Sequence, residues 1–360
     1  MTTRQRLDLL ARAYPRLFPR ADLLRLLRAQ LGHVDALDAW THREGVRVRA
    51  RAPKIIYHIC AGNLAVSAWS SLTHGLLLGA HNVMKLPGDR EDSSARREIL
   101  DFIRGLPAPL RKRVETHRAL DADLLRRADA VVAFGSDAAM SSLRAQTRWE
   151  QKFIAHGHAL SLLWLADPNR LTPRQAHACA VDVLTCDQLG CLSPQAIYVP
   201  PGTDFPSLGR KLARALEAHW QKLKKKPARP LFVTARIAEA RDMAHALGHR
   251  VWLPPRNHPG WTLIHDPEPA FQPSPLHGVI ILREAGESRL GAALASVAGR
   301  ISTVGVAGPM SSHLENVFLG LGVSRFCPAG RMQFPPLAWH HDGRSSLGDL
   351  VTWIDSENPA

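Results

Sequence analysis

The stretch HICAGNLAVSAWSSLTHGLLLGAHNVMKLPGD (58–89) contains two short apolar runs with a helical stretch between them. The first run ends at Gly62-Asn63, the helical stretch follows at 64–79, and the second run, HNVMKL, occupies 81–86. Two strands joined by a helix predict parallel pairing, because a parallel connection needs a long crossover segment. The stretch therefore predicts an α/β fold in which helices cover both faces of a parallel sheet.

The rest of the chain continues this alternation. Leucines at helical spacing predict a segment of two or three helices over residues 1–50. The pattern predicts two α/β domains, one at 51–171 and one at 172–327. It also predicts a C-terminal segment at 328–360 that returns to the first domain. The expected elements are strands at 54–60, 81–86, 128–135, 277–284 and 299–306, and helices at 64–79, 93–105, 137–146, 172–184 and 207–226; QAIYVP (195–200) and LFVTAR (231–236) follow the same alternation.

The composition is that of an ordinary globular protein, because 45% of its 360 residues are hydrophobic. The formal net charge of +14 would suit nucleic acid, an anionic lipid surface or a polyphosphate ligand. The basic residues are spread along the chain, and the one dense run, KLKKKPAR (222–229), is typical of a solvated helix end. Neither a zinc finger nor an aromatic RNA-binding signature accompanies that run, so no nucleic-acid partner is expected.

The expected location is the cytoplasm. No apolar run approaches the ~20 residues that cross a bilayer, and MTTRQRLDLLARAYPRLF (1–18) lacks the apolar block of a signal peptide. The five cysteines are few and odd in number, which favours reduced thiols over a disulfide framework. We therefore expect a protein without a transmembrane segment whose thiols are available for chemistry.

Three positions in the first predicted domain are candidates for binding or catalysis. Asn63 lies at a turn between a strand and a helix, where it could donate a side-chain amide to a substrate or simply cap the helix. Lys85 ends the next strand, where a lysine is usually only solvated. Gly135 and Ser136 end a buried run and open a helix, whose N-terminal amides bind phosphate readily. No G-x-G-x-x-G sequence is present, so the ordinary dinucleotide fingerprint is missing.

The second predicted domain contributes Cys191, in the segment CDQLGCLSPQAIYVP (186–200). A thiolate in a loop before a strand suits nucleophilic attack on a carbonyl, although a single cysteine is also often an inert core residue. Cys179 and Cys186 follow the apolar pattern of the preceding helix and are expected to be inert. The spacing of these cysteines lacks the short C-x-x-C pairs of structural zinc sites, so no metal is expected.

In order and wording, these segments resemble the aldehyde dehydrogenase superfamily, and most closely the LuxC family of acyl-CoA reductases from bacterial luminescence systems. The resemblance runs from about Pro53 to the end and includes GVSRFCPAGRMQFPPLAWHHDGRSSLGDLVTWID (322–355). It implies an aldehyde-dehydrogenase-like fold, with a cofactor-binding domain at 51–171 and a catalytic domain at 172–327. It also implies Cys191 as the nucleophile and Asn63 as a donor to the oxyanion.

The resemblance further implies that NADP(H) is the cofactor. Lys85 would contact its adenosine ribose, and its pyrophosphate would lie over Gly135 and Ser136. The nearby Asp89 and Arg90 would contact the ribose or the 2′-phosphate.

The chain departs from oxidative aldehyde dehydrogenases in FIAHGHALSLLWL (153–165). Those enzymes carry a glutamate there that activates water, whereas this stretch contains no carboxylate. His156 and His158 could act as bases or could be strand and turn residues. For 340–342 the sequence supports no chemical role, and Asp342-Gly343 predicts a tight turn.

The resemblance thus implies reduction of an acyl-CoA, or of an acyl group on a carrier or partner enzyme, to an aldehyde through a thioacyl-enzyme. Three alternatives remain open: an acyl-phosphate reductase, an aldehyde oxidiser, and a catalytically silent binding or scaffold protein. The N-terminal region is shorter than in the luminescence enzymes, so the sequence leaves open whether the chain forms a homo-oligomer.

Overall fold

The computed structural model describes residues 1–88, 94–255 and 258–357. Its contacts divide the chain into a first unit, Met1–His158 with Pro336–Ala360, and a second unit, Ala159–Pro335. The sequence had predicted boundaries after residues 171 and 327. The first boundary lies earlier because β8 (Leu160–Leu165) pairs with strands of the second unit.

The first unit is built on a five-stranded parallel sheet with the order β5-β4-β3-β6-β7. Its strands are β3 (Ile55–Ile59), β4 (His81–Lys85), β5 (Val114–His117), β6 (Ala130–Phe134) and β7 (Lys152–His156). The helices between them are α3 (Val66–Leu78), α4 (Ser94–Gly105), α5 (Ala108–Arg111), α6 (Ala122–Arg127) and α7 (Asp137–Ala145). The predicted alternation of strand and helix is therefore confirmed in this unit.

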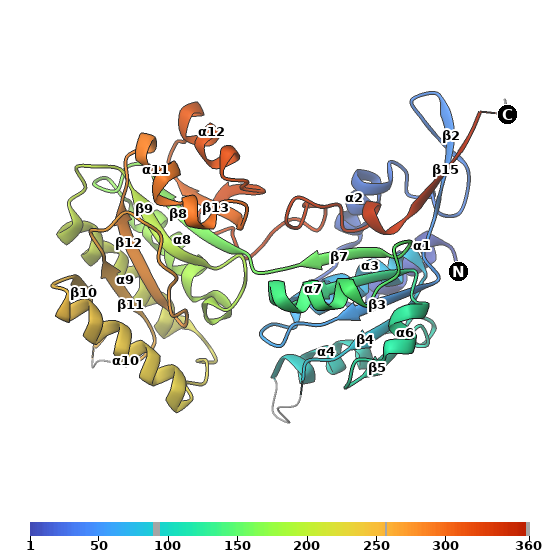
Figure 1. Ribbon diagram of the computed structural model, residues 1–360, viewed down its shortest axis with the longest axis horizontal. Helices are drawn as coiled ribbons and strands as arrows, with labels where there is room; N and C mark the ends of the chain where they lie inside the picture. Colours follow the sequence, from blue (N-terminus) through green and yellow to red (C-terminus); the bar gives the residue numbers. More distant parts are fainter. Residues whose placement is uncertain (89–93, 256–257, 358–360) are drawn as a thin grey trace. The chain divides into compact units, whose positions relative to one another are not determined.

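The central strands β3 and β6 are buried on both faces, which explains why their residues are mostly apolar. Side chains alternate between the faces along each strand. Ile56 and Val132 pack with α3 and α4 on one face, whereas Tyr57 and Val131 pack with α6 and α7 on the other. Figure 1 shows α3 and α7 on these opposite faces.

The N-terminal segment is only partly helical. Helices α1 (Thr3–Ala13) and α2 (Arg20–Leu31) form as predicted and pack with α3. Residues 41–51, however, form the strands β1 (Thr41–Arg43) and β2 (Val46–Arg51), and β2 pairs with β15 (Thr352–Ser356). The prediction of a helical segment over residues 1–50 did not include these strands, because the partner of β2 lies at the far end of the chain.

The second unit contains a seven-stranded sheet with the order β10-β11-β12-β9-β8-β13-β14. All neighbouring strands are parallel except β10, which runs antiparallel to β11. Besides β8, the strands are β9 (Pro194–Val199), β10 (Arg250–Trp252), β11 (Thr262–His265), β12 (Val279–Glu284), β13 (Ile301–Ala307) and β14 (Arg325–Pro328). The helices are α8 (Pro173–Leu184), α9 (Phe205–Lys222), α10 (Leu231–Ala246), α11 (Glu287–Ala293) and α12 (Ser312–Gly320).

The predicted features of this unit are mostly confirmed. Thr172 caps α8 in a capping box with Gln175, and α8 and α9 pack on one face of the sheet. LFVTAR forms the start of α10, which packs on β11 and β12 on the other face of the sheet. Helices α11 and α12 form a separate cluster with β8, β9 and β13. The lysines of the basic run lie exposed at and beyond the end of α9, which is shorter than predicted.

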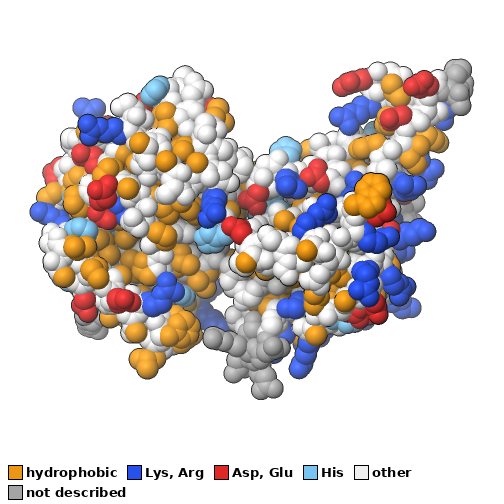
Figure 2. Space-filling model, in the orientation of Figure 1, with side chains coloured by type: hydrophobic (Ala, Val, Ile, Leu, Met, Phe, Trp, Pro, Cys, Tyr) orange, Lys and Arg blue, Asp and Glu red, His pale blue; other side chains and the backbone are white. Residues whose placement is uncertain are grey.

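On the visible face of each unit, Lys and Arg side chains are interspersed with Asp and Glu side chains (Figure 2). This mixture agrees with a positive charge that is spread along the sequence. Within the described ranges, every helix is too short or too polar to cross a lipid bilayer.

Candidate active site

The carboxyl ends of the first sheet form one edge that carries three of the predicted site residues. Strands β3, β4 and β5 follow one another in one direction, and β6 returns to pair on the other side of β3. In open α/β sheets, ligands bind outside the carboxyl ends of the strands where the order reverses in this way. Here that point lies between the ends of β3 and β6, so the loop of Asn63 and the turn at Gly135 flank it.

Gly135 and Ser136 open α7, as the sequence predicted. Ser136 is the N-cap, and its Oγ accepts a hydrogen bond from the Ala139 amide at 3.3 Å. The Gly135 amide donates to the His156 carbonyl at 3.2 Å. A β-carbon added at Gly135 would come within 3.2 Å of the Met140 methyl group, so the turn has little room for a side chain. Asp137 already places a carboxylate in the first turn, where it would oppose a bound anion.

Lys85 is the last residue of β4 and is half-buried. Its backbone pairs with Ile59 on β3 and with His117 on β5, and its carbonyl accepts from the Cys60 amide at 3.0 Å. Burial raises the pKa of the Cys60 thiol to about 12, although the charge of Lys85 opposes that rise. Lys85 thus lies on the predicted edge, and Cys60 is a poor nucleophile. Asp89 and Arg90 lie outside the described residues.

Asn63 is exposed in the loop between β3 and α3. The N-cap of α3 is Ala65, which makes no side-chain capping hydrogen bond of its own. Asn63 lies two positions before this N-cap, and the helix-cap alternative stays open. Its role as an oxyanion donor stays a prediction.

Cys191 lies in the loop between the short helix η1 (Thr185–Gln188) and β9, where it is half-buried. The Ser161 hydroxyl, on β8, donates to the Cys191 carbonyl at 2.7 Å. This bond fixes the backbone of the loop to the centre of the second sheet. Cys186, at the start of the same segment, is exposed.

The remaining cysteines are poorly suited to be nucleophiles. Cys60, Cys179 and Cys327 are all buried. Burial raises the pKa of Cys179 to about 12 and that of Cys327 to about 11, as it does for Cys60. Because the thiolate is the reactive form, these three side chains are unreactive at neutral pH.

The loop before Cys191 is strained and firmly held. Cys186, Asp187 and Gln188 have φ angles of 55°, 54° and 59°, a left-handed conformation that costs about 1–2 kcal/mol per residue. Gln188 is fully buried and makes three hydrogen bonds. Its amide donates to the carbonyls of Pro194 at 2.8 Å and Val279 at 3.0 Å, and its oxygen accepts from the Gly278 amide at 2.9 Å.

Asp187 forms a nearly buried ionic network beside Gln188. It contacts His277 Nδ1 at 2.6 Å and is paired with Arg229, and its side chain is only 12% exposed. Arg229 also donates to the carbonyls of His277 and Pro259. The network joins the loop before Cys191 to the residues before α10 and β12. Sequence reasoning missed it, because these partners are far apart in the chain.

A second set of contacts holds the loop from its C-terminal side. Gln333 donates to the Ser193 hydroxyl at 3.0 Å and to the Asp182 carbonyl at 3.2 Å. The Asp182 carboxylate is fully buried and accepts from the amides of Gly330 and Met332. Burial raises the pKa of Asp182 to about 6, although these hydrogen bonds oppose the rise.

A family model described as acyl-CoA reductase (LuxC) matches residues 2–353. The chain belongs to the LuxC family. It is therefore an oxidoreductase that acts on acyl groups. A long-chain acyl-protein thioester reductase of Aliivibrio fischeri is 21% identical over 344 residues, which are 93% of this chain and 70% of that protein.

Solved structures confirm the predicted aldehyde-dehydrogenase-like fold of this LuxC-family chain. Aldehyde dehydrogenase 21 of Physcomitrella patens matches with a TM-score of 0.65 and 14% identity, covering 99% of this chain and 86% of that one. Lactaldehyde dehydrogenase of Escherichia coli matches with a TM-score of 0.66 and 13% identity, covering 99% and 87%. At such identities the likeness concerns the fold.

The segment 153–165, which contains no carboxylate, forms most of β7 and all of β8. The boundary between the two units lies between these strands. The structure distinguishes its two histidines. His158 is exposed, and its backbone amide donates a hydrogen bond to the Asp137 carboxylate at 2.9 Å. The His156 side chain is 10% exposed, and its Nδ1 lies 2.9 Å from the Asp342 carboxylate. Asp342 and Gly343 have positive φ angles, which confirms the predicted turn there.

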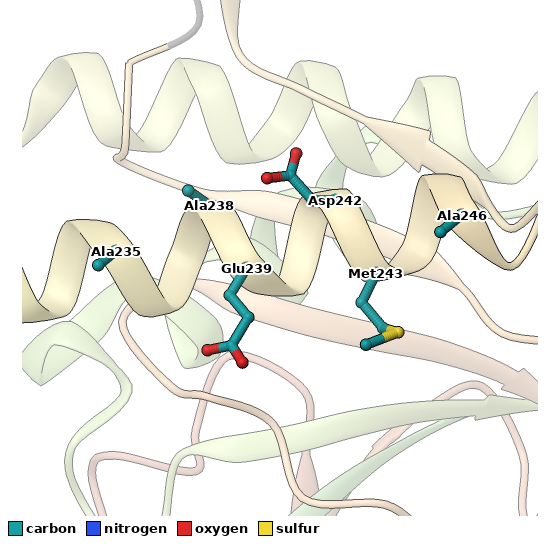
Figure 3. Close-up of a pocket in the computed structure, with 6 residues that line it drawn as sticks. All are labelled: Ala235, Ala238, Glu239, Asp242, Met243 and Ala246. Atoms are coloured by element: carbon teal, nitrogen blue, oxygen red, sulfur yellow. The ribbon is translucent and has the colours of Figure 1, made fainter.

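A surface hollow of about 600 Å³ runs along α10 (Figure 3). It is lined by Ala235, Ala238, Glu239, Asp242, Met243 and Ala246. None of these residues belongs to the sheet edge of the first unit or to the loop of Cys191.

Proposed function

We propose that this chain reduces an acyl thioester, such as an acyl-CoA or an acyl group on a carrier protein, to the aldehyde with NADPH. The observation that carries the proposal is the contrast among the cysteines. Cys60, Cys179 and Cys327 are buried thiols with raised pKa values, whereas Cys191 is half-buried in a braced loop before β9. The relative named for thioester reduction supports this substrate class.

In this proposal the Cys191 thiolate attacks the thioester carbonyl, and Asn63 with a backbone amide near Cys191 stabilises the oxyanion. The carbon–sulfur bond to the departing thiol breaks, which leaves the acyl group on Cys191. Hydride addition to that thioacyl carbon gives a hemithioacetal anion. Its collapse expels the Cys191 thiolate and releases the aldehyde.

The sheet edge of the first unit fits a nicotinamide dinucleotide. When bound, such a cofactor supplies the hydride. The Gly135–Ser136 turn offers helix amides to a pyrophosphate at the switch point of the sheet, and half-buried Lys85 ends a neighbouring strand. The preference for NADPH over NADH rests on the family resemblance.

Substrate trials separate the proposal from its rivals. Purified protein would receive NADPH or NADH with an acyl-CoA, an acyl phosphate or an aldehyde of the same chain length, and the nicotinamide absorbance would be followed. We expect NADPH oxidation with acyl-CoA to be fastest. Faster turnover of the acyl phosphate would support the acyl-phosphate reductase instead.

A matched pair of variants tests the nucleophile. Cys191→Ala should abolish turnover, whereas Cys186→Ala, in the same segment, should retain it. If the wild type has no activity and its Cys191 reacts with iodoacetamide no faster than the buried thiols, the chain is a catalytically silent member of the fold.

A further inference from the structure

The first unit gathers two histidines and an aspartate for which the proposed reaction has no role. His156 ends β7, next to the Gly135 turn, and His341 and Asp342 lie in the turn that follows the return of the chain to the first unit. His156 and Asp342 are 186 positions apart in the sequence. Their meeting is therefore a product of the fold.

The geometry of these groups suits a metal ion. The ligand atoms of His156, His341 and Asp342 all lie within 4.8 Å of one another. The same Asp342 oxygen lies 2.9 Å from His156 Nδ1 and 3.6 Å from His341 Nε2. Ligands about 2.0–2.2 Å from a tetrahedral zinc ion are separated by roughly 3.3 Å. The two distances from the Asp342 oxygen to the imidazoles are thus close to the distances between ligand atoms around a bound zinc ion. A small side-chain movement would bring the two imidazole nitrogens to a similar distance from each other.

We propose that His156, His341 and Asp342 bind a divalent transition-metal ion of the zinc class. Imidazole and carboxylate are the ligands that such ions take, and three protein ligands leave a fourth position for water. The three side chains are 10%, 19% and 25% exposed, so an ion can reach them from solvent. This inference is independent of the proposed reductase activity.

The surroundings of the cluster would hold the ligands in place. The Phe134 ring stacks on His156 with centroids 4.6 Å apart, and the Trp339 ring stacks on His341 at 4.7 Å. Packing of this kind limits ring rotation and excludes water from the sides of the site. A bound ion would cross-link the end of β7 to the C-terminal segment and so stabilise the first unit.

The test is zinc binding to the full chain after treatment with a chelator and dialysis. Calorimetric titration of the wild type with Zn²⁺ should give one site, and zinc should raise the thermal unfolding midpoint. His156→Ala and Asp342→Asn should weaken binding by more than about 100-fold, since even outer-shell partners are worth about 10- to 100-fold. His158→Ala and His340→Ala replace exposed histidines next to the proposed ligands and should bind like the wild type.

Two results would overturn the inference. The wild type could bind no zinc, or the ligand variants could bind it as tightly as the controls do. If His156→Ala does not fold, the cobalt(II) spectrum of the wild type decides. Tetrahedral bands without thiolate charge transfer support the cluster, whereas thiolate charge transfer assigns the ion to cysteine and refutes it.

Discussion

Replacing Gln188 with alanine should selectively destabilise the second unit. The side chain is fully buried and supplies hydrogen bonds to Pro194, Val279 and Gly278. Each bond contributes about 0.5–1.5 kcal/mol, and a buried group that loses its partner costs about 1–3 kcal/mol. Alanine would also keep the left-handed φ of 59° without the bonds that stabilise it. We therefore expect a loss of at least about 3 kcal/mol.

Two buried cysteines allow the stability of each unit to be measured separately. Cys60 lies in the first unit and Cys179 in the second, and each must be exposed by unfolding before it can react with an alkylating agent. Alkylation measured by mass spectrometry resolves the two sites. A loss of about 3 kcal/mol corresponds to roughly 100-fold faster labelling, so Gln188→Ala should accelerate labelling of Cys179 by about that factor and leave Cys60 unchanged.

The matched control is Gln221→Ala, which removes an exposed glutamine of the same unit that bonds only to Glu217 in the described contacts. An exposed substitution of this kind usually changes stability by less than about 0.5 kcal/mol. If Cys179 of Gln188→Ala is labelled at the rate seen in this control, the loop before Cys191 is not held by Gln188. Equal acceleration at Cys60 would show that the effect is not confined to the second unit.

Three further predictions concern the catalytic groups and the pH dependence. Asn63→Ala should lower the turnover rate by roughly 100-fold with little change in cofactor affinity, as for loss of one oxyanion donor; full activity would remove Asn63 from the mechanism. The pKa of Asp182 is about 6 in the folded state against an ordinary 3.8, so the folded chain holds more protons between these values and the second unit should lose stability as the pH rises from about 4 to about 6. Asp182→Asn should lack this part of the decline in urea titrations, and an unchanged slope would contradict the assignment. Aldehyde with NADP should stall without CoA, because the stretch 153–165 contains no carboxylate to activate water; brisk formation of free acid, scored by chromatography, would point to a base such as His156.

The sequence predicted most of the two parallel sheets because both of their faces are buried. A central strand such as β6 is then a continuous apolar run, and the helices between strands begin at recognisable residues such as Ser136 and Thr172. The pair β1 and β2 escaped prediction. Their partner β15 lies some 300 residues away, and the short arginine-rich β2 has no apolar run.

The site could be predicted in part. Cys191, Asn63, Lys85, Gly135 and Ser136 were singled out by their places at strand ends and by the family resemblance, and their roles remain predictions. The side chains that hold the loop before Cys191 could not be predicted, since polar residues such as Gln188 and Asp187 show no periodicity. Their partners come from distant loops, and only the folded chain brings them together.

The most direct test of covalent catalysis by Cys191 is the mass of the protein after incubation with an acyl-CoA and no cofactor. Peptide mapping should find one acyl group, on Cys191, and addition of NADPH should remove it and release an equal amount of aldehyde. Cys191→Ala should acquire no such group. An acyl group on another residue, or aldehyde formed by Cys191→Ala at the wild-type rate, would contradict the account.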